Sequence, residues 1–407
     1  MTSTIISAAH LDYLQRSEVP LANLSANGKM TRSDEQSRRL WHIHEIGRIN
    51  KKPVRRQEKE NRTPSEDLII GLHGYKIPLA FFVQGSSSGV AVQWGTWTRD
   101  QGMPANGNMS NHRQEILKAS LNALYPDIRL SPAKSNKLKL PKVGFALGIP
   151  TVMPFNPDDG SIALDRLIRA MANTNWACLV LAEPAEEQAV GQLRGNVIEE
   201  MRRIQSAAET KQAPPPLIKH YEQLLGVSLN NLTMGMATGS WRVGVYLMGD
   251  ELSYYRLASL WRGLFTGEKS LPEPVRIWDL SDAGELAENW TLPDEPGAAG
   301  PGFYRHPLAY QTLLTSRQLA AYCHLPQVET PGFAITAVPD FDTVPPQLSN
   351  QEAITLGQVV MYRRLVEQTY TIKRAQLSKH VFVAGVTGAG KSNTIFHLLG
   401  GPPFKCC

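Results

Sequence analysis

The chain has 407 residues and a formal net charge of +5, and 42% of its residues are hydrophobic and 19% charged. This composition excludes a wholly disordered chain, and the length leaves room for two or three folded domains. No apolar run approaches the roughly 20 residues of a membrane-spanning helix, and four cysteines are too few for a disulfide framework, so the sequence predicts a cytoplasmic protein.

Residues 1–65 form the first predicted segment, which is basic and partly disordered. Within it, residues 48–62 contain seven basic and two acidic residues, an excess equal to the net charge of the whole chain. Such a segment can dock on nucleic-acid phosphates, although we favour a solvated tail. Ser33 and Gln36 have the spacing of a capping box, which predicts a helix running toward Arg48. His42 and His44 lack further metal ligands nearby, so we expect them to face solvent.

Residues 66–140 are predicted to form a small region of strands and helices. Two short apolar runs, 79–84 and 90–94, flank a Gly-Ser-Ser-Ser-Gly sequence, which predicts a hairpin with a long turn. Further on, Ser110 can cap a helix in which Leu117, Leu121 and Leu124 share one face.

Residues 141–310 are predicted to form an α+β domain with two βαβ-like halves. The first half has a strand at 143–149, a helix around 162–171 and an apolar strand at 176–182. Pro184 has the position of the first helical residue of the next helix, and an apolar stripe follows from Val190 to Ile204. Three prolines at 214–216 then precede a helix that we expect to be short.

The second half repeats the order of the first. It has a strand at 241–248, Asp250 as the N-cap of a helix that ends near Phe265, and a strand at 275–280. Asn175-Trp176 and Ser240-Trp241 open the corresponding strands. The pattern therefore predicts a split βαβ arrangement with a helical insertion between its halves. Residues 281–310 are rich in Gly and Pro and are predicted to be a surface connection.

Residues 311–375 are predicted to be a connector, with a short helix at 316–323 and strands at 354–360 and 370–373. Residues 376–407 contain the start of a P-loop NTPase domain, opened by an apolar strand at 379–384. The predicted fold class is therefore α/β. An α+β N-terminal region precedes the first strand, P-loop and helix of an incomplete P-loop NTPase core.

The phosphate-binding motif G-x-x-x-x-G-K-[ST] is matched at every fixed position by residues 385–392. Its glycines let backbone N–H groups converge on a phosphate beside a helix N-terminus. Lys391 is expected to place its charge on the β- and γ-phosphates of ATP, and the hydroxyl of Ser392 to bind Mg²⁺. The predicted nucleotide-binding residues are Gly385, Val386, Thr387, Gly388, Ala389, Gly390, Lys391, Ser392 and Asn393.

The sequence GVTGAGKSNT at 385–394, preceded by LSKHVFVA, resembles the P-loop of the HerA–FtsK superfamily of ATP-driven DNA translocases and helicases. The segments NWACLVLAEP, CHLPQVETPGF and ITLGQVV resemble the region before the ATPase core in bacterial HerA-like proteins. The resemblance covers about residues 140–400. The superfamily also includes the conjugative and type IV secretion ATPases. The resemblance implies binding of ATP and Mg²⁺, DNA as partner and assembly into a homohexamer.

That superfamily also needs a Walker B carboxylate, a sensor residue and an arginine finger, and all of them follow the P-loop in sequence. Because only residues 393–407 follow Ser392, we expect a truncated or frameshifted product that is inactive as an ATPase on its own. The alternative is a non-motor interaction or assembly module with a vestigial P-loop.

Other polar or reactive residues have structural interpretations. Cys178 and Cys323 are expected in the core. A further set is predicted to lie in turns, loops or solvated helix faces: Asp158, Asp159, Asp340, Asp342, Glu186, Glu187, Glu199 and Glu200.

Overall fold

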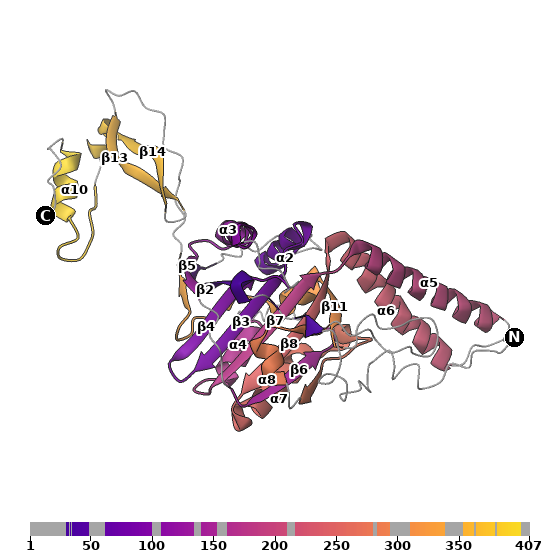
Figure 1. Cartoon of the computed structure of the whole chain (residues 1–407). Helices are drawn as coiled ribbons and strands as arrows, with labels where there is room; N and C mark the ends of the chain where they lie inside the picture. The colour runs from indigo at the N-terminus through magenta and orange to yellow at the C-terminus, as the bar shows by residue number, and fades with distance from the viewer. Residues whose placement is uncertain are drawn as a thin grey trace. The chain divides into compact units, whose positions relative to one another are not determined.

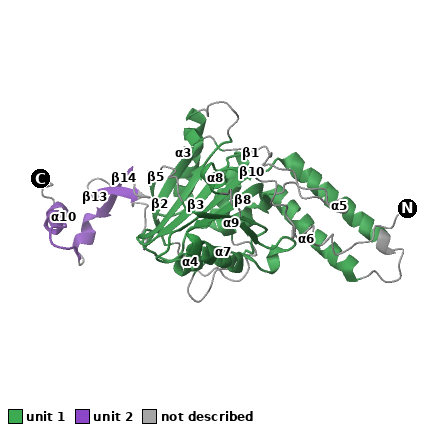
Figure 2. Cartoon of the chain, turned by 60° about the horizontal axis from the view of Figure 1, so that its bottom comes forward, with its two compact units in different colours: residues 1–336 green, residues 337–407 purple. Residues whose placement is uncertain are grey.

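The chain is described by a computed structural model that covers residues 30–31, 33, 35–48, 62–99, 107–133, 140–152, 161–209, 216–279, 283–293, 310–337, 353–361, 364–378 and 381–399. It is a mixed α/β protein with a mostly antiparallel sheet. The chain divides into two compact units, residues 1–336 and 337–407 (Figure 2). None of the helices in the described ranges is long and apolar enough to cross a membrane.

A ten-stranded sheet forms the centre of the first unit (Figure 1). Its main path runs through β12 (Ala334–Thr336), β2 (Arg39–Gly47), β4 (Gly89–Thr96), β3 (Leu79–Ser86), β7 (Trp176–Pro184), β8 (Ser240–Gly249), β6 (Lys142–Leu147) and β9 (Arg276–Asp279). In addition, β5 (Arg129–Ala133) pairs with β2, and β11 (Thr312–Thr315) pairs with β8. The β12–β2 pair is parallel, and the other pairs of this sheet are antiparallel. A separate two-stranded sheet joins β1 (Met30–Thr31) to β10 (Leu292–Pro293).

The strand order confirms the split βαβ arrangement that the sequence predicts. Strands β6 and β7 are joined through α4 (Ala163–Ala170), and β8 lies between them in the sheet. Strands β8 and β9 are joined through α7 (Glu251–Phe265), and β6 lies between them. Each crossover helix therefore connects two strands that are separated by a strand of the other βαβ half.

The predicted helical insertion joins β7 to β8 and consists of α5 (Glu187–Glu209) and α6 (Pro216–Thr238), here called the helical arm. Figures 1 and 2 both show the two helices side by side, extending away from the sheet. The predicted stripe on α5 is confirmed, since Val190, Val197 and Ile204 are buried against α6. Two details are wrong, because Pro184 ends β7 instead of opening the helix, and α6 is long instead of short.

Apolar side chains cover both faces of the sheet. One face packs against α2 (Pro64–Gly74), α3 (Gly107–Leu124), α4, α7 and α9 (Ser316–Tyr322), with the indoles of Trp94, Trp176, Trp241 and Trp261 in the core. The opposite face includes Phe145 and packs against α8 (Ala283–Glu288). A 3₁₀ turn, η3 (Glu268–Ser270), follows α7. Since both faces are covered, the central strands are apolar at nearly every position.

Other features of the first half also differ from expectation. The helix expected toward Arg48 is wrong: the capping-box pattern produces only a 3₁₀ turn, η2 (Glu35–Ser37), and β2 follows. Pairing with β4, β5 and β12 satisfies the backbone of β2, while Leu40 and Ile43 enter the two apolar faces. The predicted hairpin is confirmed, but β3 ends at Ser86 and β4 begins at Gly89, so its turn is short. Ser110 lies inside α3 and is buried.

The second unit contains β13 (Ala353–Met361), β14 (Arg364–Lys373), the 3₁₀ turn η4 (Arg374–Ser378) and α10 (Lys391–Leu398). The two strands form an antiparallel hairpin, and the second one is longer than the sequence predicts. The strand expected at 379–384 is not formed, since residues 381–384 have no regular secondary structure. The side chain of Phe382 is 93% exposed, because no strand in the described part of this unit pairs with the segment or covers it.

Several predictions lie outside the described residues. They concern most of the basic segment 48–62, most of the surface connection 281–310, the residues after 399, and the carboxylates of Asp158, Asp159, Asp340 and Asp342. The prediction of a surface connection is wrong for the part of it that is described, since residues 283–293 include α8 and β10, and Leu286, Trp290 and Leu292 are buried.

Candidate functional site

The predicted nucleotide-binding residues form one continuous loop and the first turn of α10. Residues 385 and 386 have no regular structure, residues 387–389 form a turn, and the helix begins at Lys391. In the turn, Ala389 donates its backbone N–H to the carbonyl of Val386 at 3.2 Å. The structure thus brings the predicted residues together by local chain geometry.

Two glycines of this loop have backbone conformations that side chains rarely adopt. Gly388 has φ of +82°, and Gly390, which is the N-cap of α10, has φ of +78°. Gly385 fits for another reason: a Cβ there would approach Cβ of Ala389 at 3.1 Å, which is a tight contact. The glycine spacing of the motif therefore matches two left-handed positions and one crowded position of this loop.

The ammonium of Lys391 lies inside the loop. Its Nζ donates to the carbonyl oxygens of Gly385 and Val386, each at 2.8 Å. An ammonium has three donors, so these two bonds leave one of them for a further acceptor. The lysine is thus already folded over the loop backbone, where a bound anion would meet its charge.

The start of α10 adds backbone donors beside this lysine. The first bond along the helix runs from the N–H of Thr394 to the carbonyl of Gly390 at 3.0 Å. The N–H groups of Lys391 and Ser392 precede it and have no acceptor inside the helix. Ser392 is exposed, which leaves its hydroxyl accessible to a solvated cation. The helix is attached to β13 through a contact between Nε2 of His397 and the carbonyl of Thr355 at 2.6 Å.

The surroundings of the loop differ from the sequence-based expectation. The apolar segment before it is exposed, and the described residues of the second unit contain only a two-stranded sheet. A P-loop core is therefore not shown. The described residues also contain no group of three or more His, Cys, Asp or Glu side chains that could hold a metal ion.

An ion cluster that the sequence analysis missed lies on the sheet of the first unit. The register of β7 and β8 places Glu183 opposite Arg242. Arg99 donates from Nε to both carboxylate oxygens of Glu183 at 2.8 Å, and Arg242 also donates to this carboxylate. Burial lowers the pKa of Arg242, and the charge of Glu183 opposes that shift. The three residues are far apart in sequence, so only strand pairing reveals the cluster.

The two histidines of β2 do not face open solvent as expected. His42 and His44 are half-buried, and their ring centroids are 4.1 Å apart. Nε2 of His44 contacts the Ser131 hydroxyl at 2.7 Å. Burial lowers the pKa of His42 below its ordinary value of 6.5, and the neighbouring His44 lowers it further. The two rings lie together because these residues form a strand and not the predicted helix, and residues two apart on a strand share one face.

The remaining candidates are structural. Cys178 and Cys323 are buried free thiols, as predicted, and burial raises the pKa of Cys178 to about 12. Glu186, Glu187 and Glu199 are exposed, as predicted. Glu200 is an exception, because it is buried in the helical arm and accepts a hydrogen bond from the Tyr221 hydroxyl at 3.3 Å.

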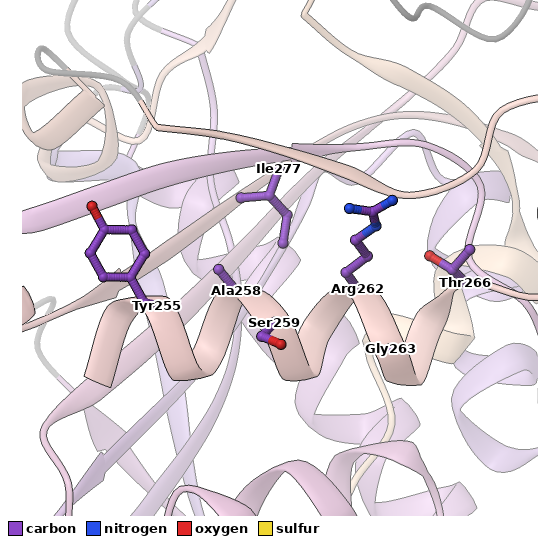
Figure 3. A pocket seen from close by; sticks show the side chains of 7 residues that line it. All are labelled: Tyr255, Ala258, Ser259, Arg262, Gly263, Thr266 and Ile277. Carbon is purple, nitrogen blue, oxygen red and sulfur yellow. The ribbon is translucent and has the colours of Figure 1, made fainter. Parts of the chain in front are cut away.

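A groove on the first unit is a further candidate site, and no sequence pattern indicated it. Figure 3 shows it along α7, beside the strand that carries Ile277. Its volume is about 580 Å³. The lining residues are Tyr255, Ala258, Ser259, Arg262, Gly263, Thr266 and Ile277.

Comparisons with known proteins do not assign a family. No protein-family model matches the sequence, and no curated protein matches it. The functional interpretation therefore depends on the phosphate-binding motif, the geometry of its loop and the sequence resemblance described above.

Proposed function

We propose that residues 385–393 bind the phosphates of ATP together with Mg²⁺. The observation that carries this proposal is the loop geometry: a lysine folded over a backbone whose two left-handed positions are both glycine. This arrangement fits an anion, because the ammonium lies over the loop and belongs to the first residue of α10, beside the N-terminal N–H groups of that helix.

Each group has a distinct task in this proposal. The ammonium of Lys391 exchanges its bonds to the two loop carbonyls for phosphate oxygens. The first N–H groups of α10 donate to the same phosphates, aided by the positive end of the helix dipole. Ser392 offers its hydroxyl to Mg²⁺, which usually keeps several waters and bridges to phosphate oxygens.

We further propose that the chain acts as an ATP-binding part of a system related to HerA-type DNA translocases and helicases. Support comes from the sequence of residues 385–394 and from the upstream segments that resemble the same proteins. Only this resemblance supports DNA as the partner and a homohexamer as the assembly. The non-motor interaction module remains the alternative, and the exposed groove on the first unit favours it.

The test is equilibrium binding of a fluorescent ATP analogue with Mg²⁺ to the full chain. We expect weak binding, because the exposed segment before the loop provides no packed strand to hold it. Lys391→Ala should weaken binding about tenfold or more, since it removes the ammonium. Lys373→Ala is the matched control, because Lys373 is an exposed lysine of the same unit, outside the loop.

Equal affinity of the native chain and Lys391→Ala would refute nucleotide binding at this loop. Tight binding, in the submicromolar range, would contradict the argument that the loop lacks support. DNA binding is tested separately with labelled duplex DNA at increasing salt, where phosphate contacts predict a steep loss of affinity.

A further inference from the structure

The groove along α7 combines an apolar floor with polar side chains on one helix face. In Figure 3 the side chains of Tyr255, Ala258, Arg262 and Thr266 rise from the helix toward Ile277 of β9. Ala258 and Ile277 supply the apolar surface, and the other groups surround it. A ligand there would meet a hydrophobic contact and several donors at once.

The charge of this surface is positive. Arg262 lines the groove and is exposed, and its guanidinium has no hydrogen bond or ion pair within the described residues. Lys142 adds a second positive charge, since its ammonium lies 5.8 Å from the ring centroid of Tyr255. The nearby carboxylate of Asp279 already accepts a hydrogen bond from the Tyr254 hydroxyl. A carboxylate-bearing ligand would therefore find the unpaired guanidinium of Arg262.

A buried hydroxyl also lacks a partner at this place. Oγ1 of Thr266, at the end of α7, is buried and makes no hydrogen bond within the described residues. Buried hydroxyls are normally hydrogen-bonded, so an orphan that lines a groove points to an acceptor or donor brought by a ligand.

The strand beside the groove is the last strand of its sheet. Strand β9 pairs with β6 on one side, and no strand in the described ranges pairs with its other side. Its outward N–H and C=O groups form a template for an added strand. A peptide in extended conformation could thus pair with β9 while its side chains reach α7.

We infer that the groove between α7 and β9 binds an acidic peptide segment in extended conformation. The peptide backbone pairs with the free edge of β9, and an Asp or Glu side chain accepts hydrogen bonds from Arg262 in a paired geometry. Apolar side chains of the peptide contact Ala258 and Ile277, and a backbone or side-chain group bonds to Thr266.

A single-stranded nucleic acid fits this surface less well. Such ligands are held by several aromatic side chains on which successive bases stack. The groove offers one half-exposed aromatic ring, Tyr255, and the ammonium of Lys142 lies near it. The free edge of β9 has no role in stacking, whereas it is the natural partner of a peptide backbone.

The experiment measures the binding of a labelled peptide to the full chain. Valine and aspartate take turns at every second position of this peptide, and threonine fills the positions between, so that both kinds of side chain lie on the face toward α7. We expect this peptide to bind, and a peptide with lysine in place of aspartate not to bind. Arg262→Gln should weaken binding about tenfold. Arg202→Gln, at an exposed arginine of α5 that is 74% exposed, should leave binding unchanged.

A second measurement tests the backbone contacts. Two valine–aspartate peptides, N-methylated at alternate residues in the two registers, should differ, because only one of them loses the N–H groups that face β9. Amide hydrogen exchange of residues 276–279 should slow when the unmodified peptide binds.

The inference is overturned if the aspartate peptide fails to bind at millimolar concentration, or if Arg262→Gln binds it like the native chain. It is also overturned if both N-methylated peptides bind equally well. If oligothymidylate binds more strongly than the peptide, with a steep salt dependence and a loss in Arg262→Gln, the ligand of the groove is a nucleic acid and not a peptide.

Discussion

The carboxylate of Asp165 connects the start of α4 to a distant loop. One oxygen accepts the backbone N–H of Ile162 at 2.8 Å, which caps the helix. The other accepts the N–H of Gln327 at 2.9 Å and that of Val328 at 3.3 Å. The residue is 5% exposed, so all three donors depend on it in a nearly dry environment.

The cost of removing this carboxylate follows from those three bonds. Loss of a helix N-terminal cap costs about 1 kcal/mol, and a buried donor without an acceptor costs about 1–3 kcal/mol. Asp165→Ala should therefore destabilise the first unit by about 3 kcal/mol or more. Asp165→Asn keeps an oxygen for two of the donors and should cost only about 1 kcal/mol.

The assay is urea unfolding followed by tryptophan fluorescence. All eight tryptophans lie before residue 337, so the signal reports the first unit alone. The expected result is a clear drop of the midpoint for Asp165→Ala at unchanged slope, with Asp165→Asn close to the native chain. A loss below about 1 kcal/mol for Asp165→Ala would refute the argument that these bonds join α4 to the loop.

The same pair of chains tests the titration of Asp165. Burial raises the pKa of this carboxyl above its ordinary value of 3.8, against the N–H groups of Ile162, Gln327 and Val328. An acid with a raised pKa in the folded state stabilises the fold when protonated and loses that contribution as pH rises. The native chain should therefore lose stability relative to Asp165→Asn as pH rises above 3.8, the ordinary pKa of the carboxyl. Both free energies of unfolding are measured at each pH.

Three further substitutions test other buried polar groups. Ser316→Ala should lower the free energy of unfolding by about 1–3 kcal/mol, because the Ser316 hydroxyl accepts the indole N–H of Trp241 at 3.0 Å. An unchanged midpoint of urea unfolding would contradict this. Glu183→Gln should lower the free energy of unfolding of the first unit by about 1–3 kcal/mol, since Arg242 keeps its charge in a partly buried place and loses the carboxylate, and added salt should not restore the stability. His42 has a lowered pKa, so stability should fall as pH drops below 6.5; His42→Gln should flatten this dependence, and an equally steep profile would refute the assignment.

Local patterns predicted the elements whose stability is local or strongly periodic. The stripe on α5, the apolar runs of β7 and β8 and the N-cap of α7 are all found, and Asp250 accepts the N–H of Ser253 at 2.9 Å. The order of these elements was enough to predict the split βαβ arrangement, because short connections and strand pairing leave few alternatives.

The wrong predictions concern residues whose structure depends on pairing with strands distant in sequence. The spacing of Ser33 and Gln36 predicted a helix through the residues that follow, yet these residues form β2, which pairs with three strands that are distant in sequence. Its two histidines therefore share a half-buried face that the helix model did not suggest. The cluster of Glu183 and Arg242 has the same origin, since cross-strand register is invisible to spacing along one chain.

The phosphate-binding loop shows how far a motif alone can be used. Its fixed positions predicted the turn and the helix that follows, because left-handed glycines and a helix N-terminus are local features. The strand predicted before it depends on neighbouring strands, and residues 381–384 have none within the described part of the second unit. The sequence pattern of residues 381–384 could show that the segment is apolar. It could not show whether a neighbouring strand is present to pair with it.

The two ends of the helical arm meet at one point of the sheet. The N–H of Ala185 donates to the carbonyl of Ser240 at 2.8 Å, and Pro184 lies opposite Trp241 in the register of β7 and β8. The path of the chain from β7 to β8 is therefore closed at the base of the arm, as in a hairpin. The arm also contributes to the sheet, since Leu313 of β11 packs into its apolar cluster and the Ser316 hydroxyl donates to the carbonyl of Thr238 at the end of α6. Its outer turns can therefore vary in length and surface more freely than its base.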